Sequence, residues 1–317
     1  MSGDLDRLAA RIAAELARRD TAHQTRDAGG QGGEARRATT APSGRERPAH
    51  AAAPPGVSFV REQARIADFI DHTLLKPEAT RAEIEKLCDE AATHRFAAVC
   101  VNPVWVPLCA SRLRGTAAKV ATVIGFPLGA NTPETKAFEA QRAVGDGAQE
   151  LDMVAAIGMI KTGDWNHVAR DIESVVRASS GNLVKVIIES SLLTPTEIIK
   201  ASALAKEAGA QYVKTSTGFH ASGGATAEAV TLMRLAVGDA LGVKASGGVR
   251  DCTAALRMIA SGATRIGTSG GVAMSECLGT GPLPLRELLS TAASHGSHCA
   301  SGRCAPASSG GSGAQPY

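Results

Sequence analysis

The sequence predicts an α/β protein, a (β/α)8 TIM barrel with disordered N- and C-terminal extensions. Eight short β-rich runs alternate with helical patterns over about 235 residues, as expected for parallel strands joined by helices. The first run continues as "FIDHTLLKPEAT" without a glycine, so the nucleotide-binding turn of an open doubly wound sheet is absent there. Polar and small residues collect where the runs end, which is where barrel enzymes place their chemistry.

The eight expected strands follow one another at regular spacing. They cover residues 69–75, 97–103, 120–126, 150–157, 183–190, 212–218, 242–248 and 265–271. Helical patterns over 80–95, 134–147 and 195–210 separate some of them. Thr80 and Glu83 have the spacing of a capping box at a helix start, and Gly209 is a plausible helix stop.

Composition divides the chain into three parts. Residues 1–57 are rich in Ala, Arg, Gly and Pro and cannot bury a core, although apolar residues at helical spacing predict a short helix over 4–19. The folded body is expected over 58–292, and residues 293–317 form a flexible Gly/Ser-rich tail.

Charge and cysteine content narrow the functional class. A net charge of +3 over 317 residues predicts neither a nucleic acid nor a membrane partner, and no apolar run reaches the roughly 18 residues of a spanning helix. The seven cysteines are an odd number and scattered. Because the N-terminus also lacks a signal peptide, we expect reduced thiols in a cytoplasmic protein.

Two lysines occupy unusual positions in the predicted barrel. Lys214 lies in "YVKTSTGFH" and Lys244 in "GVKASGGVR", and strand alternation turns both side chains inward, as it does Asp152. A single strand lysine is more often a salt-bridged structural residue. Two on adjacent strands repel each other and lose hydration, which leaves one amine neutral and nucleophilic near pH 7. This pattern favours Schiff-base chemistry, with Asp152 neutralising the other ammonium.

Other charged or ligand-type residues have simpler interpretations. Lys185 is expected deeper in the barrel, paired with a carboxylate in a structural role. His72 has no second histidine at ligand spacing, so a satisfied histidine is expected there. The tail sequence "HGSHCASGRC" resembles metal-ligand spacing but lies in low-complexity sequence, and no metal is predicted.

Glycine-rich turns follow the last two strands. "SGGVR" (246–250) and "GTSGG" (267–271) stand where barrel enzymes often hold phosphate on backbone N–H groups. Arg250 adds a positive charge and Ser269 a hydroxyl, so the turns indicate a phosphorylated substrate.

Taken together, these motifs resemble the deoxyribose-phosphate aldolase family, class I aldolases with a (β/α)8 barrel. The resemblance runs through the body in "IDHTLLKPEAT", "VCVNP", "VIGFPLG", "ELDMV", "KVIIE", "VKTSTGF" and "KASGGVR". It implies reversible cleavage of 2-deoxy-D-ribose 5-phosphate to acetaldehyde and D-glyceraldehyde 3-phosphate, without a metal or an organic cofactor. The extensions are outside the resemblance, and Phe219 stands where some members have a phosphate-binding lysine.

The resemblance also implies roles for individual residues. Lys214 would form the Schiff base, Lys244 would perturb its pKa and relay protons, and Asp152 would donate and accept protons. The implied phosphate ligands are Gly218, Gly247, Gly248, Arg250, Gly267 and Ser269. The implied substrate-pocket residues are Asp71, Thr73, Cys100 and Thr217, and a C-terminal Tyr317 would assist proton transfer.

Partners and alternatives complete the expectation. The partners would be a small sugar phosphate and aldehydes, with the chain assembling as a homodimer or homotetramer. Another lysine-dependent aldolase, such as a transaldolase-like enzyme, and a non-catalytic phosphate-binding barrel are the alternative functions.

Overall fold

A computed structural model describes residues 62–294, together with residues 3, 7, 10–12 and 14 near the N-terminus. Most of the extension 1–57, with most of the helix predicted over 4–19, lies outside the described residues, as does the tail sequence with Tyr317. The last helix, α11 (Leu285–Ser294), ends two residues beyond the predicted boundary at 292.

Eight parallel strands close into the predicted barrel. Each strand pairs with the next along the chain, and the first pairs with the last. They are β2 (Ile70–Leu74), β3 (Ala98–Val101), β4 (Lys119–Ile124), β5 (Glu150–Val154), β6 (Leu183–Ile187), β7 (Tyr212–Lys214), β8 (Gly242–Ser246) and β9 (Arg265–Thr268). The observed strands stop before the predicted ones do, because the polar and glycine residues at their carboxyl ends form loops.

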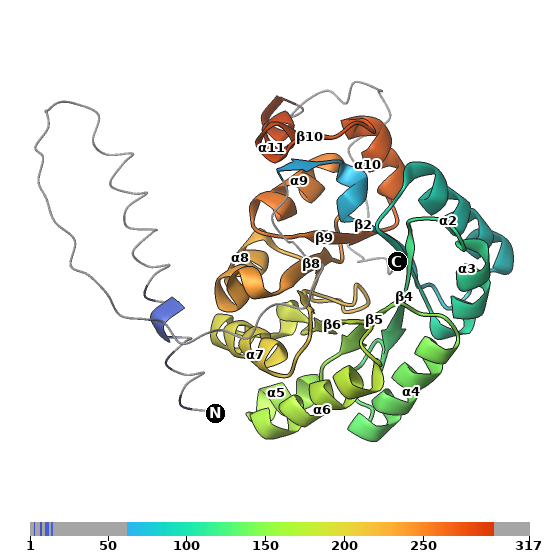
Figure 1. Cartoon of the computed structure of the whole chain (residues 1–317). Coiled ribbons are helices and arrows are strands. Elements are labelled where there is room, and N and C mark those ends of the chain that lie inside the picture. Colours follow the sequence, from blue (N-terminus) through green and yellow to red (C-terminus); the bar gives the residue numbers. More distant parts are fainter. Residues whose placement is uncertain (1–2, 4–6, 8–9, 13, 15–61, 295–317) are drawn as a thin grey trace, which may run out of the picture.

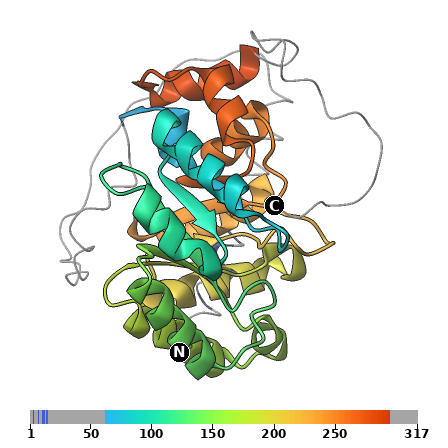
Figure 2. The same ribbon diagram turned by 90° about the vertical axis from the view of Figure 1, so that its right-hand side faces the viewer.

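Helices form a ring around the strands, as Figure 1 and the side view in Figure 2 show. The α-helices before α11 are α2 (Arg81–His94), α3 (Val106–Arg112), α4 (Pro133–Gly145), α5 (Ile157–Thr162), α6 (Trp165–Ala178), α7 (Pro195–Glu207), α8 (Ala227–Val237), α9 (Cys252–Ala260) and α10 (Gly271–Leu278). Short 3-10 helices are η1 (Ile66–Phe69), η2 (Pro103–Trp105), η3 (Ser190–Leu192) and η4 (Gly238–Ala240). The described helices include none that is both long enough and apolar enough to cross a membrane.

Local sequence signals explain where these helices begin and end. The capping box predicted for Thr80 and Glu83 is present at the start of α2. At α7, Thr194 caps the first turn and Pro195 occupies the first helical position. Gly209 follows this helix with φ of +87°, a left-handed conformation that suits a glycine after a helix end.

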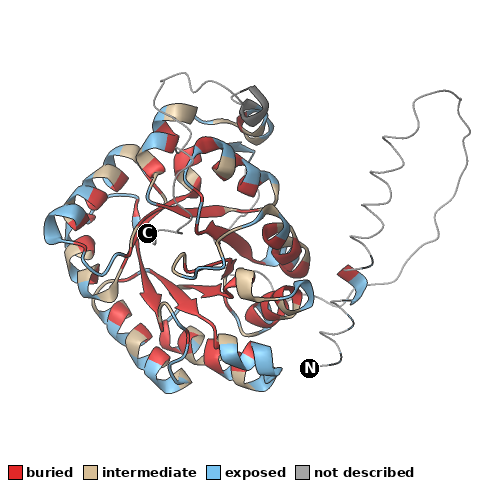
Figure 3. Ribbon diagram, turned by 180° about the vertical axis from the view of Figure 1, so that it is seen from behind, coloured by how far each residue is buried: buried red, intermediate tan, exposed pale blue. Residues whose placement is uncertain are grey.

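The packing of apolar residues confirms the alternation that the strands were predicted to have. In Figure 3 the barrel strands are mostly buried, whereas the surrounding helices are exposed on their outer faces. Leu151, Met153, Val213, Val243 and Ala245 belong to the apolar layer between strands and helices. A smaller apolar cluster of Leu75, Ala98, Cys100, Ala121 and Val123 lies apart from it, and the rest of the barrel interior is strongly polar.

A short antiparallel pair closes the body. β1 (Gln63–Ala64) pairs with β10 (Leu283–Pro284), which joins the segment before the first barrel strand to the segment before α11. The two ends of the described body are therefore fixed to each other on one side of the barrel (Figure 1).

Candidate active site

Three lysines converge on one aspartate inside the barrel. Asp152 Oδ2 accepts hydrogen bonds from Lys214 Nζ at 2.9 Å and from Lys244 Nζ at 2.7 Å. Its Oδ1 accepts from Lys185 Nζ at 2.7 Å. Lys214 and Lys244 are direct register partners on β7 and β8, so the barrel places the two predicted lysines side by side.

The two central amines have opposite pKa shifts. Burial lowers the pKa of Lys214, and the Lys244 charge lowers it further against the opposing effect of Asp152. Burial alone would lower the pKa of Lys244 too, but the charges of Asp152 and Asp71 raise it well above the usual value. The pair therefore consists of an amine that gives up its proton readily and an ammonium that keeps its own.

The charge network extends below this pair to residues that the sequence reasoning missed. Lys185 Nζ lies 2.6 Å from Glu150 Oε2, which confirms its expected pairing with a carboxylate. Arg265 Nη1 contacts both Glu150, at 3.1 Å, and Asp71. Glu150 lies two residues before Asp152 and Arg265 two before Gly267, so the same period-two alternation could have placed both inside.

Asp71 lies in this network rather than on an open pocket wall. It is fully buried and binds both Lys244 and Arg265. Burial alone would raise the pKa of its carboxyl, but the charges of Arg265, Lys244 and Lys185 hold it far below the usual range. Asp71 therefore stays ionised and stabilises the charge on Lys244.

The other predicted pocket residues are also deeply buried. Thr73 and Cys100 are register partners on β2 and β3. The Thr73 hydroxyl donates to the carbonyl of Asp71 at 2.8 Å, and Cys100 Sγ lies 4.0 Å from Asp152 Oδ2. Burial raises the pKa of the Cys100 thiol, so this cysteine is a neutral wall of the lysine site.

Glu189 holds the loop that follows Lys214 and was absent from the predicted site. Its carboxylate accepts from the backbone N–H of Thr217 at 3.2 Å and from the Thr217 hydroxyl. That hydroxyl accepts in turn from the N–H of Phe219 at 3.1 Å. Glu189 itself has φ of +49°, a conformation unusual for a non-glycine residue and often found at functional sites. The hydroxyl of Thr217 is thus already hydrogen-bonded to two protein groups, the Glu189 carboxylate and the Phe219 N–H.

Glycine backbones bring the loops after β7 and β8 into contact. A Cβ on Gly224 would lie 2.1 Å from the carbonyl oxygen of Gly247. A Cβ on Gly247 would lie 2.9 Å from Gly224 Cα and 3.4 Å from Gly218 Cα. Gly218 and Gly247 both have positive φ, +84° and +85°, so a tight junction of peptide groups forms above the two lysines.

The remaining predicted phosphate residues divide between the surface and the interior. Gly248, Arg250 and Ser269 are exposed, whereas Gly267 is buried. A Cβ on Gly267 would lie 3.1 Å from Lys244 Cε and 2.3 Å from Ser246 Oγ. The structure thus gives Gly267 a packing role that the sequence did not indicate, which is to leave space for the lysine side chain.

Two serine hydroxyls near the lysines have no hydrogen-bond partner among the described residues. Ser216 Oγ and Ser246 Oγ are buried and unpaired. Ser246 ends β8 on the same strand face as Lys244, and Ser216 lies in the loop two residues after Lys214, where β7 ends. Buried hydroxyls are normally paired, so these two are available to a bound substrate.

His72 is only partly satisfied, since its Nδ1 is buried without a hydrogen-bond partner among the described residues. Its Nε2 lies 2.7 Å from Glu90 Oε2, and its ring packs at 5.1 Å from that of Phe96. Phe219, the departure from the family motif, packs edge-on against Phe126 with ring centroids 5.2 Å apart.

Comparison with known proteins identifies the family. Residues 65–277 match the family model described as DeoC/LacD family aldolase. The chain belongs to the DeoC/LacD aldolase family. It is 60% identical over 212 residues to the deoxyribose-phosphate aldolase of Geobacillus sp. (strain WCH70), an alignment that covers 67% of this chain and 95% of the relative.

Solved structures agree with this membership of the aldolase family. An aldolase named QR15 superposes with a TM-score of 0.64 at 41% identity, covering 67% of this chain and 94% of its own. The deoxyribose phosphate aldolase from Aeropyrum pernix, described as tetrameric, gives a TM-score of 0.61 at 36% identity, covering 65% and 88%. The part of this chain before residue 65 is outside the family match.

Proposed function

We propose that this aldolase reversibly cleaves 2-deoxy-D-ribose 5-phosphate into acetaldehyde and D-glyceraldehyde 3-phosphate through a Schiff base on Lys214. The observation that carries the proposal is the lysine pair: an amine with a lowered pKa hydrogen-bonds the same carboxylate oxygen as an ammonium with a raised pKa. A neutral, desolvated amine beside a fixed cation is suited to attack a carbonyl carbon. The named relatives act on the corresponding substrate class.

The proposed reaction uses the amine as a nucleophile and the iminium formed from it as an electron sink. Lys214 Nζ adds to C1 of the open-chain sugar, and loss of water from the carbinolamine gives an iminium. The C3 hydroxyl then loses its proton, the C2–C3 bond breaks, and its electron pair forms an enamine with the iminium carbon. Glyceraldehyde 3-phosphate leaves, C2 takes up a proton, and water hydrolyses the second iminium to release acetaldehyde.

Asp152 and Lys244 are the groups placed to move these protons. Both lie within hydrogen-bond distance of each other, and Asp152 also contacts Lys214. Lys185 holds the second oxygen of Asp152, so the carboxylate is fixed in orientation while protons are exchanged. General acid–base catalysis by such positioned groups contributes on the order of 10²–10⁴ in rate.

Substrate phosphate would bind where the glycine loops meet. Peptide N–H groups around Gly218, Gly247 and Gly248 and the exposed guanidinium of Arg250 supply donors and charge. We expect Arg250→Ala to raise KM for deoxyribose 5-phosphate about 10- to 150-fold, for the loss of one charge-assisted contact of about 1.5–3 kcal/mol. Unphosphorylated deoxyribose is the control, and an equal loss for both sugars would contradict this assignment.

Two measurements test the proposed reaction. Acetaldehyde release from deoxyribose 5-phosphate should be observed and should persist after EDTA treatment, as the absence of a metal requirement predicts. Sodium borohydride with acetaldehyde should fix an ethyl group on Lys214, identified by peptide mass spectrometry. If Lys214 is labelled but no acetaldehyde is released from deoxyribose 5-phosphate, the protein is an aldolase that acts on a different substrate.

Assembly and location complete the proposal. Val104, Leu128 and Phe138 are large apolar side chains exposed by 75%, 75% and 71%, which a contact between subunits would bury. Together with the tetramer reported for the Aeropyrum pernix relative, they support a homodimer or homotetramer, to be tested by light scattering. The five described cysteines are free, which agrees with a reducing, cytoplasmic location.

A further inference from the structure

A second charged hollow lies at the opposite end of the barrel from the lysine site. Its volume is about 600 Å³, and its lining includes Arg65, Asp68, Arg95, Ala97, Ala117 and Pro282. Arg65 precedes η1 and β2, Ala97 directly precedes β3, and Ala117 lies just before β4. These residues are all at the amino ends of strands, whereas the loops of the proposed active site follow the carboxyl ends. The volume is within the range of small-molecule sites.

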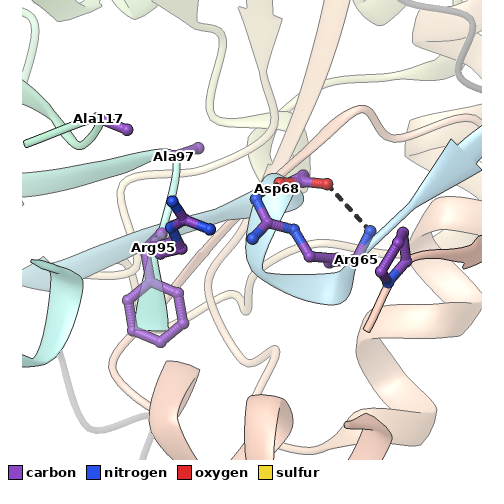
Figure 4. Close-up of a pocket in the computed structure, with 7 residues that line it drawn as sticks. Arg65, Asp68, Arg95, Ala97 and Ala117 are labelled. Carbon is purple, nitrogen blue, oxygen red and sulfur yellow. Dashed lines mark hydrogen bonds and ion pairs between the residues drawn. The ribbon is translucent and has the colours of Figure 1, made fainter. Parts of the chain in front are cut away.

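Two guanidinium groups face each other across this hollow (Figure 4). Arg65 Nη2 lies 2.6 Å from Asp68 Oδ1, and its backbone N–H donates to the same carboxylate. Arg95 is exposed, and no described residue accepts a hydrogen bond from its guanidinium or pairs with it. The Asp68 carboxylate is therefore engaged by Arg65, and Arg95 is a cation without an ion pair to any described residue.

The backbone of Arg95 strengthens the case that its side chain has a use. Arg95 caps the C-terminus of α2 with φ of +58° and ψ of +45°. This left-handed position is usually filled by glycine or asparagine, since a Cβ there is unfavourable. An arginine at this point costs stability, and its guanidinium makes no hydrogen bond or ion pair with the described residues in return, but it lies at the edge of the hollow.

We propose that this hollow binds a small organic phosphate monoester, at a site separate from the catalytic one. A phosphate dianion between Arg65 and Arg95 would accept paired hydrogen bonds from both planar guanidinium groups and relieve their repulsion. Ala97, Ala117 and Pro282 give a small apolar surface for the carbon atoms of the ligand. This inference does not depend on the proposed reaction.

Isothermal titration of the full chain with sn-glycerol 3-phosphate at low ionic strength tests the proposal. This probe has no carbonyl group and cannot react with Lys214. We expect two sites per chain, one lost in Arg250→Ala and the other in Arg95→Gly, with affinity at the affected site falling at least about tenfold. Arg95→Gly suits the left-handed backbone, so its melting temperature should be at least that of the unaltered protein, which verifies folding.

Arg170→Ala, which removes an exposed arginine of α6, is the matched control and should keep both sites. Arg65→Gln should weaken the Arg95 site, because it also leaves the Asp68 carboxylate to repel the anion. An unchanged titration in Arg95→Gly, an equal loss in Arg170→Ala, or equal binding of nitrate would overturn the proposal. The Arg250 result bears on the catalytic site alone, so the two proposals fail independently.

Discussion

The described part of the chain contains two buried lysine–aspartate systems, and they differ in how many cations share one carboxylate. Between α4 and α6, Lys136 Nζ lies 2.7 Å from Asp171 Oδ2 and donates to the carbonyl of Val154 at 2.9 Å. Inside the barrel, the single carboxylate of Asp152 contacts three lysines. The first system is one cation with one anion, while the second has more cations than Asp152 can neutralise.

The comparison shows that a lowered lysine pKa does not by itself mark a nucleophile. Burial lowers the pKa of Lys136 as it does that of Lys214. Lys136 is enclosed, however, since a Cβ on Gly125 would already lie 2.9 Å from its Cε. Lys214 ends its strand beside a glycine-lined loop junction, and its Nζ donates only to Asp152 among the described residues. Access at a strand end and a shared counter-ion distinguish the reactive lysine.

The largest expected effect is that of Lys214→Ala. Both the borohydride label and aldol cleavage should disappear, because no other amine reaches the same position with a lowered pKa. Mass spectrometry of the acetaldehyde-treated variant checks this. Label on Lys136 in either protein would break the comparison, and label on Lys244 would exchange the two barrel roles.

Lys136→Met should instead reduce stability. Breaking a buried pair by removing one partner costs about 3–5 kcal/mol, and Asp171 would remain with only the N–H of Ala156 at 3.1 Å. Urea denaturation measures this loss. The double variant Lys136→Met/Asp171→Leu is the control and should recover much of the stability, because no uncompensated charge is left. Folded Lys136→Met should still be labelled at Lys214.

Lys244→Ala should change the pH profile rather than abolish the chemistry. The Lys244 charge lowers the pKa of Lys214, so its removal raises that pKa, and Asp152 then attracts the Lys214 proton more strongly. Because the neutral amine is the reactive form, activity near pH 7 should fall at least about tenfold. It should partly return as the pH rises. A profile of kcat/KM with the same midpoint as the unaltered enzyme would contradict the proposed role.

Much of the fold and the centre of the site could be predicted from sequence. Strand alternation was enough to place Lys214, Lys244 and Asp152 inside a barrel, because a period of two leaves little choice of face. Glu150 and Arg265, the first residues of β5 and β9, were missed. Charged residues at the start of a strand are commonly exposed, and only the closed barrel brings these two into contact.

Other features depend on contacts between distant segments. The sequence indicates that Gly267 lies in a turn, but only the packing of β8 against β9 shows that its missing Cβ leaves space for Lys244. The pair of Lys136 and Asp171 joins two helices 35 residues apart, and neither helix pattern indicates a partner for its charge. The strained backbone of Glu189 has no signal in the residue type.

The smallest expected effect is that of removing single buried hydroxyl groups near the lysines. Two of these hydroxyls are unpaired within the described residues, and a third is hydrogen-bonded to the backbone. Ser216 Oγ and Ser246 Oγ have no partner among the described residues, whereas Thr215 Oγ1 donates to Ser246 O at 3.1 Å and accepts from Ser246 N at 3.0 Å. Removing a hydroxyl that pairs only with substrate should lower kcat/KM about 2- to 12-fold, for a net hydrogen bond of about 0.5–1.5 kcal/mol, without a loss of stability.

Ser216→Ala and Ser246→Ala should therefore keep the urea midpoint and lose catalytic efficiency. Thr215→Val, the matched control at a neighbouring buried hydroxyl, should do the reverse, since it removes the hydrogen bonds of that hydroxyl to the backbone N–H and carbonyl of Ser246. Steady-state kinetics and urea denaturation of the three variants distinguish the two behaviours. If both serine variants lowered stability and left kcat/KM unchanged, their hydroxyls would be structural. The polar groups that bind substrate would then be the lysines and the peptide groups alone.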